Sequence, residues 1–309
     1  MPARILSGKP IAEAIKAEVA AEVADLKEVH RFAPCLAVVR VGEDPASAVY
    51  VGSKVRTVEE LGMISEHLHF DASVSQDEIV ATVKDLNERN DVDGILVQLP
   101  LPKHIDERVI LELIDPEKDV DGFHPMNSGR LMQGYDSLVP CTPAGVIEIL
   151  KRSNIEIAGK HAVVIGRSNI VGKPMAMLLL RENATVTICH SRTHDLTAVT
   201  READILIAAI GRAGFISGKH IREGATVVDV GINNLSDPTM AKALFPDDAI
   251  EKRLATIETK GFTLIGDVDQ RAAYDRAGAF TPVPGGVGLL TVAMLMKNTV
   301  KAAKMRRSI

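Results

Sequence analysis

A tyrosine and a lysine stand four residues apart in the early segment YVGSK. Four residues make about one helical turn, so a helix over residues 46–61 would place Tyr50 and Lys54 on one face. An ammonium group beside an aromatic ring could carry a proton while the ring stacks on a flat ligand. An ordinary amphipathic helix surface has the same spacing, so the pair by itself leaves both interpretations open.

Two further polar residues lie where α/β proteins bind ligands. Gln98 closes an apolar strand in QLPLP, and the prolines that follow require an extended exit at the carboxyl end of that strand. Asp121, in DVDGFHP, could accept two hydrogen bonds from the amidine-like edge of a heterocycle. A plain strand exit and a turn aspartate before glycine also explain these residues.

A glycine-containing loop, GRSNIVGKP at 166–174, follows an apolar strand and opens a helix. Glycines in this position allow backbone N–H groups to approach a phosphate at the positive end of the helix. The context predicts a dinucleotide-binding loop. Its two glycines are separated by five residues and depart from the GxGxxG spacing, so a simple strand-to-helix turn stays open.

The next apolar strand ends in HSRT, where a Rossmann protein contacts the adenosine ribose. NAD enzymes usually place an acidic residue there, whereas Ser191 and Arg192 offer donors suited to a ribose phosphate. The pair favours NADP over NAD, with a solvated loop as the alternative. Ser191, His194 and Asp195 have the residue types of a catalytic triad, but adjacency in sequence is not triad geometry.

Composition excludes several classes of protein. The chain has 309 residues, a net charge of −5 and no long run of basic residues, so we expect no nucleic-acid partner. The longest apolar stretches, such as 203–211, are too short for a membrane span, and the first ten residues lack a signal-peptide apolar region. We therefore expect a soluble cytoplasmic protein with no membrane partner.

Cysteine and histidine spacing predicts no metal site. Cys35, Cys141 and Cys189 form no CxxC pair, so neither a disulfide framework nor a zinc knuckle is indicated. His67 and His69 alternate on one strand, but no third ligand has a useful spacing, so we interpret them as structural.

Apolar runs of strand length alternate with longer stretches of helical period from about residue 11 onward, which predicts an α/β fold with a parallel sheet. Predicted strands cover 35–42, 64–70, 93–100, 161–166, 184–190, 203–211 and 226–231. Predicted helices cover 9–30, 46–61, 76–89, 106–114, 143–153 and 172–182, with one more after TPVPGG.

The length suggests two domains. Residues 115–134 are polar, rich in Gly, Pro and Asp, and without clear periodicity, so they are the predicted linker. We expect an N-terminal α/β domain, a Rossmann-type NAD(P)-binding domain and a cleft between them.

Six motifs in this order resemble those of the bifunctional methylenetetrahydrofolate dehydrogenase/cyclohydrolase family. They are YVGSK (50–54), VQLPLP (97–102), DVDGFHPMNSG (119–129), CTPAG (141–145), GRSNIVGKP (166–174) and TPVPGGVG (281–288). The resemblance runs from about residue 3 to 304. Six ordered motifs are far more specific than any one of them, so the resemblance favours the functional interpretations above.

The resemblance implies NADP-dependent oxidation of methylene-tetrahydrofolate to the methenyl form and hydrolysis of that cation to 10-formyltetrahydrofolate. It implies NADP as cofactor, tetrahydrofolate one-carbon derivatives as ligands, and a place in one-carbon metabolism and purine biosynthesis. It also implies a homodimer through the nucleotide-binding half. No metal is expected, because the substrate is already a strong electrophile.

The resemblance further implies roles for individual residues. Lys54 matches the essential lysine of the hydrolytic step, and Gln98 matches the residue that holds and tunes it. Tyr50 matches the aromatic residue that stacks on the folate, and Asp121 the carboxylate that reads the pterin. The expected folate-binding set is Tyr50, Lys54, Val97, Gln98, Leu99, Asp121, Pro284, Gly285, Gly286, Val287 and Gly288.

On the cofactor side, the expected NADP-binding residues are Gly166, Arg167, Ser168, Ser191, Arg192 and Ile232. The last helix is expected to return to the first domain and make it discontinuous. The folate domain would then comprise 1–140 plus 285–309, and the NADP-binding domain 141–284.

Three features depart from the family pattern. Leu289 and Leu290 follow PGGVG in place of Pro-Met, which bears on the start of the last helix, and Ala213 stands where the strand motif usually has proline. Residues 234–264 are longer than the usual short hairpin. We expect a solvated excursion there, with an extra surface helix near the cofactor side as the alternative.

Two other functions fit the same scaffold. A monofunctional dehydrogenase would keep the NADP site and lack hydrolysis, but the chain retains Lys54 and Gln98. A non-catalytic NADP-binding regulator would use the scaffold as a sensor, and a turnover assay would distinguish it from an enzyme.

Overall fold

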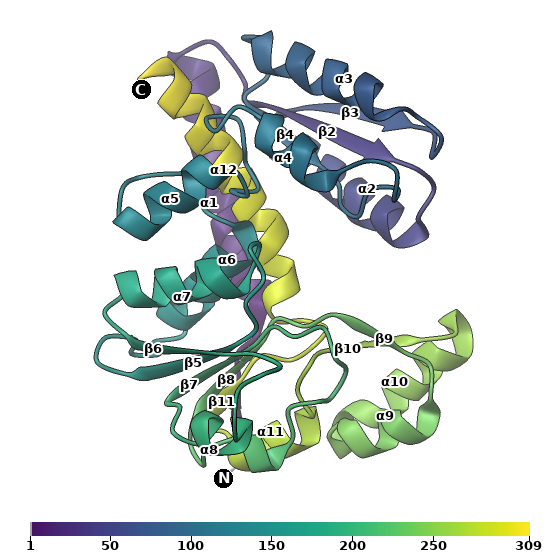
Figure 1. Cartoon of the computed structure of the whole chain (residues 1–309), viewed down its shortest axis with the longest axis vertical. Helices are drawn as coiled ribbons and strands as arrows, with labels where there is room; N and C mark the ends of the chain where they lie inside the picture. The colour runs from purple at the N-terminus through teal and green to yellow at the C-terminus, as the bar shows by residue number, and fades with distance from the viewer. Residues whose placement is uncertain (1) are drawn as a thin grey trace. The chain divides into compact units, whose positions relative to one another are not determined.

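The computed structural model describes residues 2–309, apart from the side chains of residues 45–50. The chain forms two compact units, each made of two separate segments of the sequence (Figure 1). Unit 1 comprises Met1–Ala12 and Thr142–Thr291, and unit 2 comprises Glu13–Cys141 and Val292–Ile309. Within the described residues, no helix is both long and apolar enough to cross a membrane.

Unit 1 is built on a six-stranded parallel sheet. Its strands are β1 (Arg4–Ile5), β5 (His161–Ile165), β6 (Thr185–Cys189), β7 (Ile205–Ala208), β8 (Thr226–Asp229) and β11 (Ala279–Phe280). Their order across the sheet is β1-β11-β8-β7-β5-β6. Every residue of β7 and β8 is buried, as expected for central strands of a parallel sheet with helices on both faces.

Helices cover both sides of this sheet in Figure 1. They are α6 (Cys141–Arg152) and α7 (Gly172–Arg181) on one side, and α8 (Leu196–Thr200) and α11 (Gln270–Arg276) on the other. Val163, Leu206 and Val227, from three adjacent strands, share an apolar core with Ala273 of α11. Because all the strands are parallel, the loops that follow β5, β7 and β8 emerge at one edge.

Residues 233–265 form an arm of unit 1. The arm contains β9 (Asn233–Leu235), α9 (Pro238–Leu244), α10 (Asp247–Lys260) and β10 (Thr263–Ile265), with β9 and β10 paired antiparallel. Phe245 and Ile257 are buried in a small apolar core inside it. The insert therefore contains the extra surface helix of the alternative, here as two helices, and it differs from a plain solvated excursion by its small core, in which Ala241, Phe245 and Ile257 are buried.

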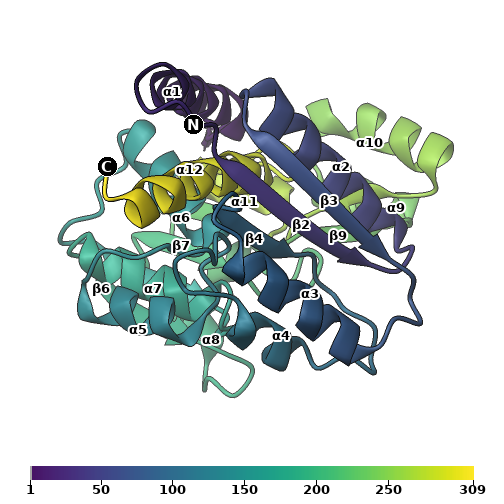
Figure 2. The same ribbon diagram turned by 90° about the horizontal axis from the view of Figure 1, so that it is seen from above.

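Unit 2 contains a three-stranded parallel sheet. Its strands, in order across the sheet, are β3 (Ile64–Phe70), β2 (Cys35–Val41) and β4 (Gly94–Val97). Its helices are α1 (Gly8–Val29), α2 (Pro45–Glu60), α3 (Gln76–Glu88), α4 (Glu107–Leu113), α5 (Pro125–Gln133) and α12 (Val287–Arg307), of which α1 and α12 begin in unit 1. Figure 2 shows α3 and α4 along one face of this sheet, where Ile79 and Ile110 pack with Val39.

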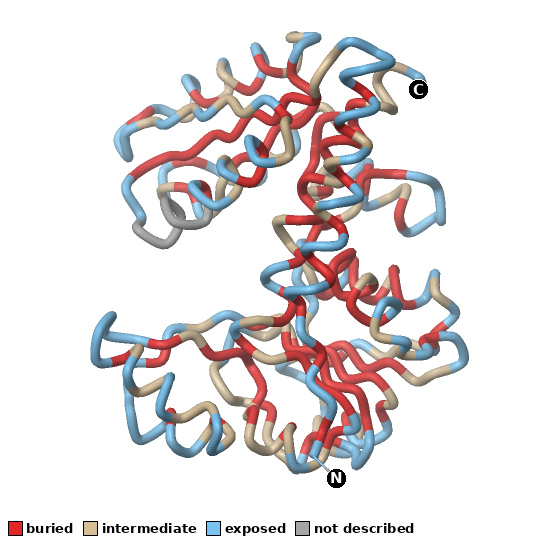
Figure 3. Tube along the Cα trace, turned by 180° about the vertical axis from the view of Figure 1, so that it is seen from behind, coloured by how far each residue is buried: buried red, intermediate tan, exposed pale blue. Residues whose placement is uncertain are grey.

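Buried residues concentrate along the inner strands of both sheets (Figure 3). In unit 2 the whole of β2 is buried, because it is the central strand. The backbone N–H and C=O groups of a fully buried strand must be hydrogen-bonded, because water does not reach them. The neighbouring strands β3 and β4 both pair with β2 in register. The sheet thus supplies a rigid edge for the loop that follows β4.

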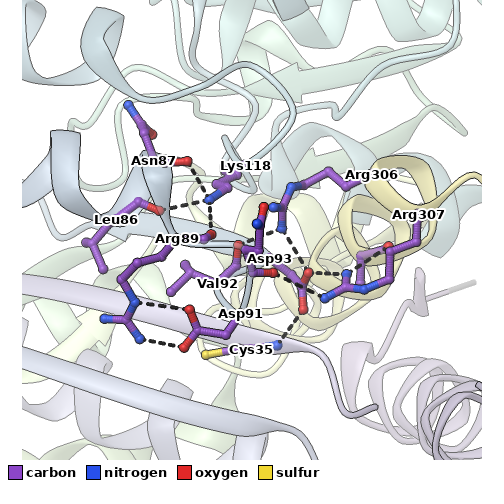
Figure 4. Close-up of polar contacts among 12 residues, drawn as sticks. Cys35, Leu86, Asn87, Arg89, Asp91, Val92, Asp93, Lys118, Arg306 and Arg307 are labelled. Atoms are coloured by element: carbon purple, nitrogen blue, oxygen red, sulfur yellow. Dashed lines mark hydrogen bonds and ion pairs between the residues drawn. The ribbon is translucent and has the colours of Figure 1, made fainter. Parts of the chain in front are cut away.

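The end of α12 is fixed to unit 2 by a buried carboxylate (Figure 4). Asp93, with no exposed side-chain surface, accepts hydrogen bonds from Arg306 Nη1 at 3.0 Å and from Arg307 Nη1. Its other oxygen accepts from the backbone N–H of Cys35 at 3.0 Å. The Arg307 guanidinium also lies 4.0 Å from the centre of the Phe32 ring. We call Asp93, Arg306 and Arg307 the Asp93 cluster.

Lys118, also buried, lies beside this cluster in Figure 4. Its ammonium donates to the carbonyl oxygens of Leu86, Asn87 and Arg89 at 2.8, 2.8 and 2.6 Å. A cation is favourable at the carboxyl end of a helix, here α3, because unpaired carbonyls collect there. Lys118 thereby joins the predicted linker to the core of unit 2.

The compact units differ from the predicted domains at two places. Residues up to Ala12 belong with unit 1, because β1 pairs with β11 and Gly8 N–H donates to the Gly285 carbonyl at 2.8 Å. Residues 285–291 also belong with unit 1. The predicted linker at 115–134 is an ordered part of unit 2 that contains α5, in which Asn127 is buried and donates to Asp119 at 2.9 Å.

Candidate functional site

Lys54 and Gln98 are brought together in unit 2. α2 carries Lys54, and Gln98 directly follows β4, where its backbone N–H extends the sheet by donating to Val39 O at 2.8 Å. Lys54 Nζ donates to Gln98 Oε1 at 3.0 Å. Gln98 Nε2 in turn donates to the Leu99 carbonyl at 2.7 Å, which turns the amide oxygen toward the lysine. The amide oxygen therefore fixes the position of the Lys54 side-chain nitrogen.

Asp121 lies in a tight turn of the same unit. Gly122 has φ +72°, and a Cβ there would lie 2.5 Å from the carbonyl carbon of Val139, so the DG turn requires glycine. Burial raises the pKa of Asp121 to about 6, the positive charge of Lys54 opposes that rise, and the charge of Asp119 adds to it. Asp121 is therefore a carboxyl group that titrates near neutral pH within the field of the Lys54 ammonium.

The other folate-binding residues expected in unit 2 are Tyr50, Val97 and Leu99. Tyr50 lies on α2 one turn before Lys54, and its side chain is outside the described residues. The Val97 side chain is buried in the core with α3, and Leu99 packs against that core. Only the backbone of Val97 is therefore able to face a ligand.

The loop after β5 in unit 1 has the features of a phosphate-binding turn. Gly166 has φ +131°, and a Cβ there would lie 2.2 Å from the carbonyl oxygen of Ala209. Ser168 Oγ accepts from the backbone N–H groups of Val171 and Gly172, both at 3.2 Å, at the start of α7. Arg167 and Ser168 are exposed. An exposed loop that leads from a strand into the start of a helix is a common position for a bound phosphate.

Ser191 and Arg192 are exposed in the turn after β6. This turn is held by two local bonds, from His190 N–H to Thr193 Oγ1 at 2.8 Å and from Arg192 N–H to His190 Nδ1 at 3.1 Å. Asp195 accepts from Ala198 N–H at 3.1 Å and caps α8. That local capping role accounts for Asp195 without a catalytic triad.

The loop 284–288 starts α12 and packs against the beginning of the chain. A Cβ on Gly8 would lie 2.1 Å from the Gly286 carbonyl oxygen, so the two backbones touch there. Ile232 is 46% exposed, and its Cδ1 would lie 3.5 Å from a Cβ on Gly288, which places these two expected ligand contacts side by side. Pro284, Gly285 and Val287 belong to the same turn.

The departures from the family pattern have identifiable surroundings. Leu290 is fully buried and lies against Gly145, where a Cβ would approach its side chain to 2.8 Å, whereas Leu289 is 43% exposed. Ala213 packs against the apolar core of the arm.

Among the histidines, His67 and His69 stack with ring centres 6.2 Å apart, and His69 Nε2 lies 3.2 Å from the Gly42 carbonyl. The described residues contain no group of three potential metal ligands.

Sequence reasoning missed two buried aspartates of unit 1. Asp229 ends β8 and Asp267 follows β10, and both side chains are almost fully buried. Each contacts backbone N–H groups of loops at the carboxyl edge of the sheet. A signal exists in the sequence, since each aspartate lies beside a glycine and an apolar strand, in DVG and GDV.

The sequence matches two family models. Residues 6–121 match the tetrahydrofolate dehydrogenase/cyclohydrolase catalytic domain, and residues 140–307 match the NAD(P)-binding domain of the same family. A curated relative, Bifunctional protein FolD from Koribacter versatilis, is 58% identical over 307 residues, which is 99% of each chain. The relative of the same name from Solibacter usitatus is 51% identical over 306 residues, again 99% of each chain.

Two solved structures have the same fold. The bifunctional methylenetetrahydrofolate dehydrogenase/cyclohydrolase FolD from Campylobacter jejuni has a TM-score of 0.87 and 44% identity, covering 98% of this chain and 99% of its own. The dehydrogenase-cyclohydrolase from Trypanosoma brucei, complexed with NADP cofactor and an inhibitor, has a TM-score of 0.88 and 37% identity over the full length of both chains.

Proposed function

Because the chain belongs to the tetrahydrofolate dehydrogenase/cyclohydrolase family, we propose that it is a bifunctional enzyme of one-carbon metabolism. It oxidises methylene-tetrahydrofolate with NADP and hydrolyses the methenyl product to 10-formyltetrahydrofolate. The observation that carries the hydrolytic half is the 3.0 Å bond between Lys54 and Gln98 at the end of a buried strand. A dehydrogenase without hydrolysis has no need of that pair.

In the hydrolytic step, water adds to the methenyl carbon, the bond from that carbon to N5 breaks, and one proton is released. We propose that Lys54 carries one proton of the attacking water to N5 as the carbon–N5 bond breaks, while the other water proton is the one released. Gln98 contributes by holding the ammonium through its amide oxygen, and its own N–H group is fixed on Leu99 O. A single oriented group then serves both proton transfers, which is efficient general acid–base catalysis.

Unit 2 supplies the remaining proposed folate contacts. Asp121, as a carboxylate, would accept two hydrogen bonds from the pterin edge, and Tyr50 would stack on the ring. The backbone at Val97 and Leu99 would line the same ligand. In unit 1, Pro284, Gly285, Gly286, Val287 and Gly288 make up the proposed folate-side loop.

Unit 1 supplies the proposed cofactor contacts. NADP, when bound, accepts a hydride from the substrate methylene carbon. The residues that would hold it are Gly166, Arg167, Ser168, Ser191, Arg192 and Ile232. The residues present fit a phosphate-bearing nucleotide, because the Gly166 turn has no room for a Cβ and the loop that leads into α7 exposes Arg167 and Ser168. Positioning supplies much of the rate of a hydride transfer, so unit 1 needs few acid or base groups.

We expect a marked preference for NADP over NAD, because Ser191 and Arg192 offer donors to a ribose phosphate. The test is a spectrophotometric assay with methylene-tetrahydrofolate and each cofactor that follows methenyl formation and decay. Arg192→Ala should lower the preference by about tenfold, the value of one charge-assisted contact. Arg201→Ala, another exposed arginine of unit 1, is the matched control. Equal efficiency of wild-type enzyme with NAD and NADP would refute this assignment.

We expect the catalytic efficiency for the methylene substrate to rise between about pH 5 and pH 7, because burial raises the pKa of Asp121 to about 6. Below that pKa the carboxyl group is protonated and loses a hydrogen-bond acceptor. The catalytic efficiency should therefore fall by up to about tenfold for each pH unit below the pKa. Asp121→Asn should remove this rise, and Asp136→Asn, which changes an exposed carboxylate of unit 2, should retain it. An unchanged profile in Asp121→Asn would contradict the proposed role.

Finer points of the function are also proposals. A homodimer through unit 1 is supported by β6, an edge strand near which Leu180 and Ile188 are 56% and 39% exposed. A cytoplasmic location is supported by three free, buried cysteines, which suit a reducing compartment. A contribution to purine biosynthesis follows from 10-formyltetrahydrofolate as a formyl donor. Sedimentation analysis would test the dimer directly.

A further inference from the structure

Two buried carboxylates organise the loops at the carboxyl edge of the unit 1 sheet. Asp229 Oδ1 accepts from the backbone N–H groups of Gly231 at 3.0 Å and Asp267 at 2.9 Å. Its Oδ2 accepts from Val268 N–H at 2.9 Å. Asp229 therefore joins the segment after β8 to the segment after β10, and it fixes the backbone from which Asp267 projects.

Asp267 holds the loop that follows β7. Its Oδ2 accepts from the N–H groups of Ile210 at 2.5 Å and Gly211 at 2.9 Å, and its Oδ1 accepts from Arg212 N–H at 2.7 Å. Three consecutive backbone donors thus converge on one side chain with no exposed surface. Such a concave set of N–H groups is an anion site, and here the protein's own carboxylate fills it.

This loop adjoins the proposed cofactor contacts. Its first residue, Ala209, lies against Gly166 so closely that a Cβ on Gly166 would come within 2.2 Å of the Ala209 oxygen. On the other side, a Cβ on Gly231 would lie 2.3 Å from the Asp267 carboxylate, and Gly231 directly precedes Ile232. A shift of the 209–212 loop would therefore displace the Gly166 turn, and a shift of Asp267 would displace Ile232.

The arm braces the same loop from outside the sheet. Asn233 Nδ2, at the base of the arm, donates to Asp267 Oδ1 at 3.1 Å. A Cβ on Gly214 would lie 2.9 Å from the Leu244 side chain of α9, and Ala213 packs on the core of the arm. Gly214 N–H donates to the Gly266 carbonyl at 3.1 Å. The loop is thus held at one end by Asp267 and at the other by α9.

We propose that Asp267 is a positioning residue for the nucleotide site and that the arm, through Leu244, supports the same loop. The assignment rests on the proposed function, since it takes NADP as the ligand of unit 1. Asp267 touches no reacting atom; it acts by fixing the 209–212 loop, which in turn fixes the Gly166 turn and Ile232.

The test of Asp267 is Asp267→Asn in the full chain. The amide has the same shape, but its NH₂ group must face backbone N–H donors, which leaves buried donors unpaired. We expect the KM and Kd for NADP to rise about tenfold, with a smaller change in kcat at saturating cofactor. Methenyl hydrolysis consumes no cofactor, so its rate should stay within about twofold. A general loss of folding would lower both activities together.

An Asp267→Asn enzyme with unchanged affinity for NADP, or with hydrolysis reduced as much as oxidation, would overturn the proposal. Wild-type enzyme that fails to bind NADP would instead refute the proposed function, so the two failures are distinguishable. The wild-type titration is therefore measured first.

The arm offers a second test with a matched control on one helix. Leu244→Ala removes the side chain that meets Gly214, whereas Met240→Ala shortens a side chain of similar size that is 43% exposed, one turn earlier on α9. We expect Leu244→Ala to raise the KM for NADP about threefold and Met240→Ala to leave it unchanged. Equal effects of the two substitutions would show that the arm does not support the loop.

Discussion

Replacing Lys54 with alanine is expected to lower the rate of methenyl hydrolysis by about a thousandfold, within the range for removal of a general acid–base group. The Lys54 side-chain nitrogen is held 3.0 Å from Gln98 Oε1, and alanine removes it altogether. Oxidation of the methylene substrate should fall much less, since hydride transfer requires positioning and little proton movement. Assays of methenyl decay without cofactor and of methenyl formation with NADP would measure the two steps separately.

Arg56→Ala is the matched control for Lys54→Ala. Arg56 lies two residues further along α2 and is exposed, so its removal should change hydrolysis by less than about twofold. Titration with folate substrate and NADP should show that Lys54→Ala still binds both. Hydrolysis at the wild-type rate in Lys54→Ala would refute the assigned role of the lysine.

Asp93→Ala is expected to lower the free energy of unfolding by about 3–5 kcal/mol, as when one partner of a buried ion pair is removed. The substitution would leave the guanidinium groups of Arg306 and Arg307 without their shared carboxylate, and the Cys35 N–H without its acceptor. Urea denaturation followed by circular dichroism would measure the change. Asp93 is one of several groups that fix α12 in unit 2, and it holds the end of the helix.

Asp91→Ala is the matched control for Asp93→Ala. Asp91 is 70% exposed and pairs with Arg89 at 2.8 Å on the surface, where solvent and salt screen the interaction. Its removal should leave the urea midpoint nearly unchanged. If both substitutions shifted the midpoint by the same amount, burial of Asp93 would not be the source of its stabilising effect.

The α/β fold class and the family were predictable from the sequence, and both are confirmed. Strand β2 was predicted over 35–42 and spans Cys35–Val41, because a run of buried apolar residues has few alternatives. The strand predicted over 203–211 ends at Ala208. Its apolar continuation leaves the sheet because the next N–H groups bond to Asp267, 55 to 57 residues away.

Elements that depend on distant partners were not predictable from local pattern. β1 has only two residues and is a strand because β11 lies beside it. The helix α5 was read as linker, since its sequence is polar and its burial depends on Asn127 and Asp119. At the site, Lys54 and Gln98 were identified from the order of the motifs. The structure shows that the two side chains are hydrogen-bonded. Their catalytic roles stay predictions.

Each unit is made of two separate segments of the chain, and this bears on synthesis by the ribosome. Unit 2 requires Val292–Ile309, with Arg306 and Arg307 bound to Asp93. A nascent chain that has reached residue 291 contains all the residues of unit 1. It still lacks Val292–Ile309, the part of α12 that belongs to unit 2. Translation therefore supplies Val292–Ile309 of unit 2 only after all the residues of unit 1, so unit 1 is able to fold first.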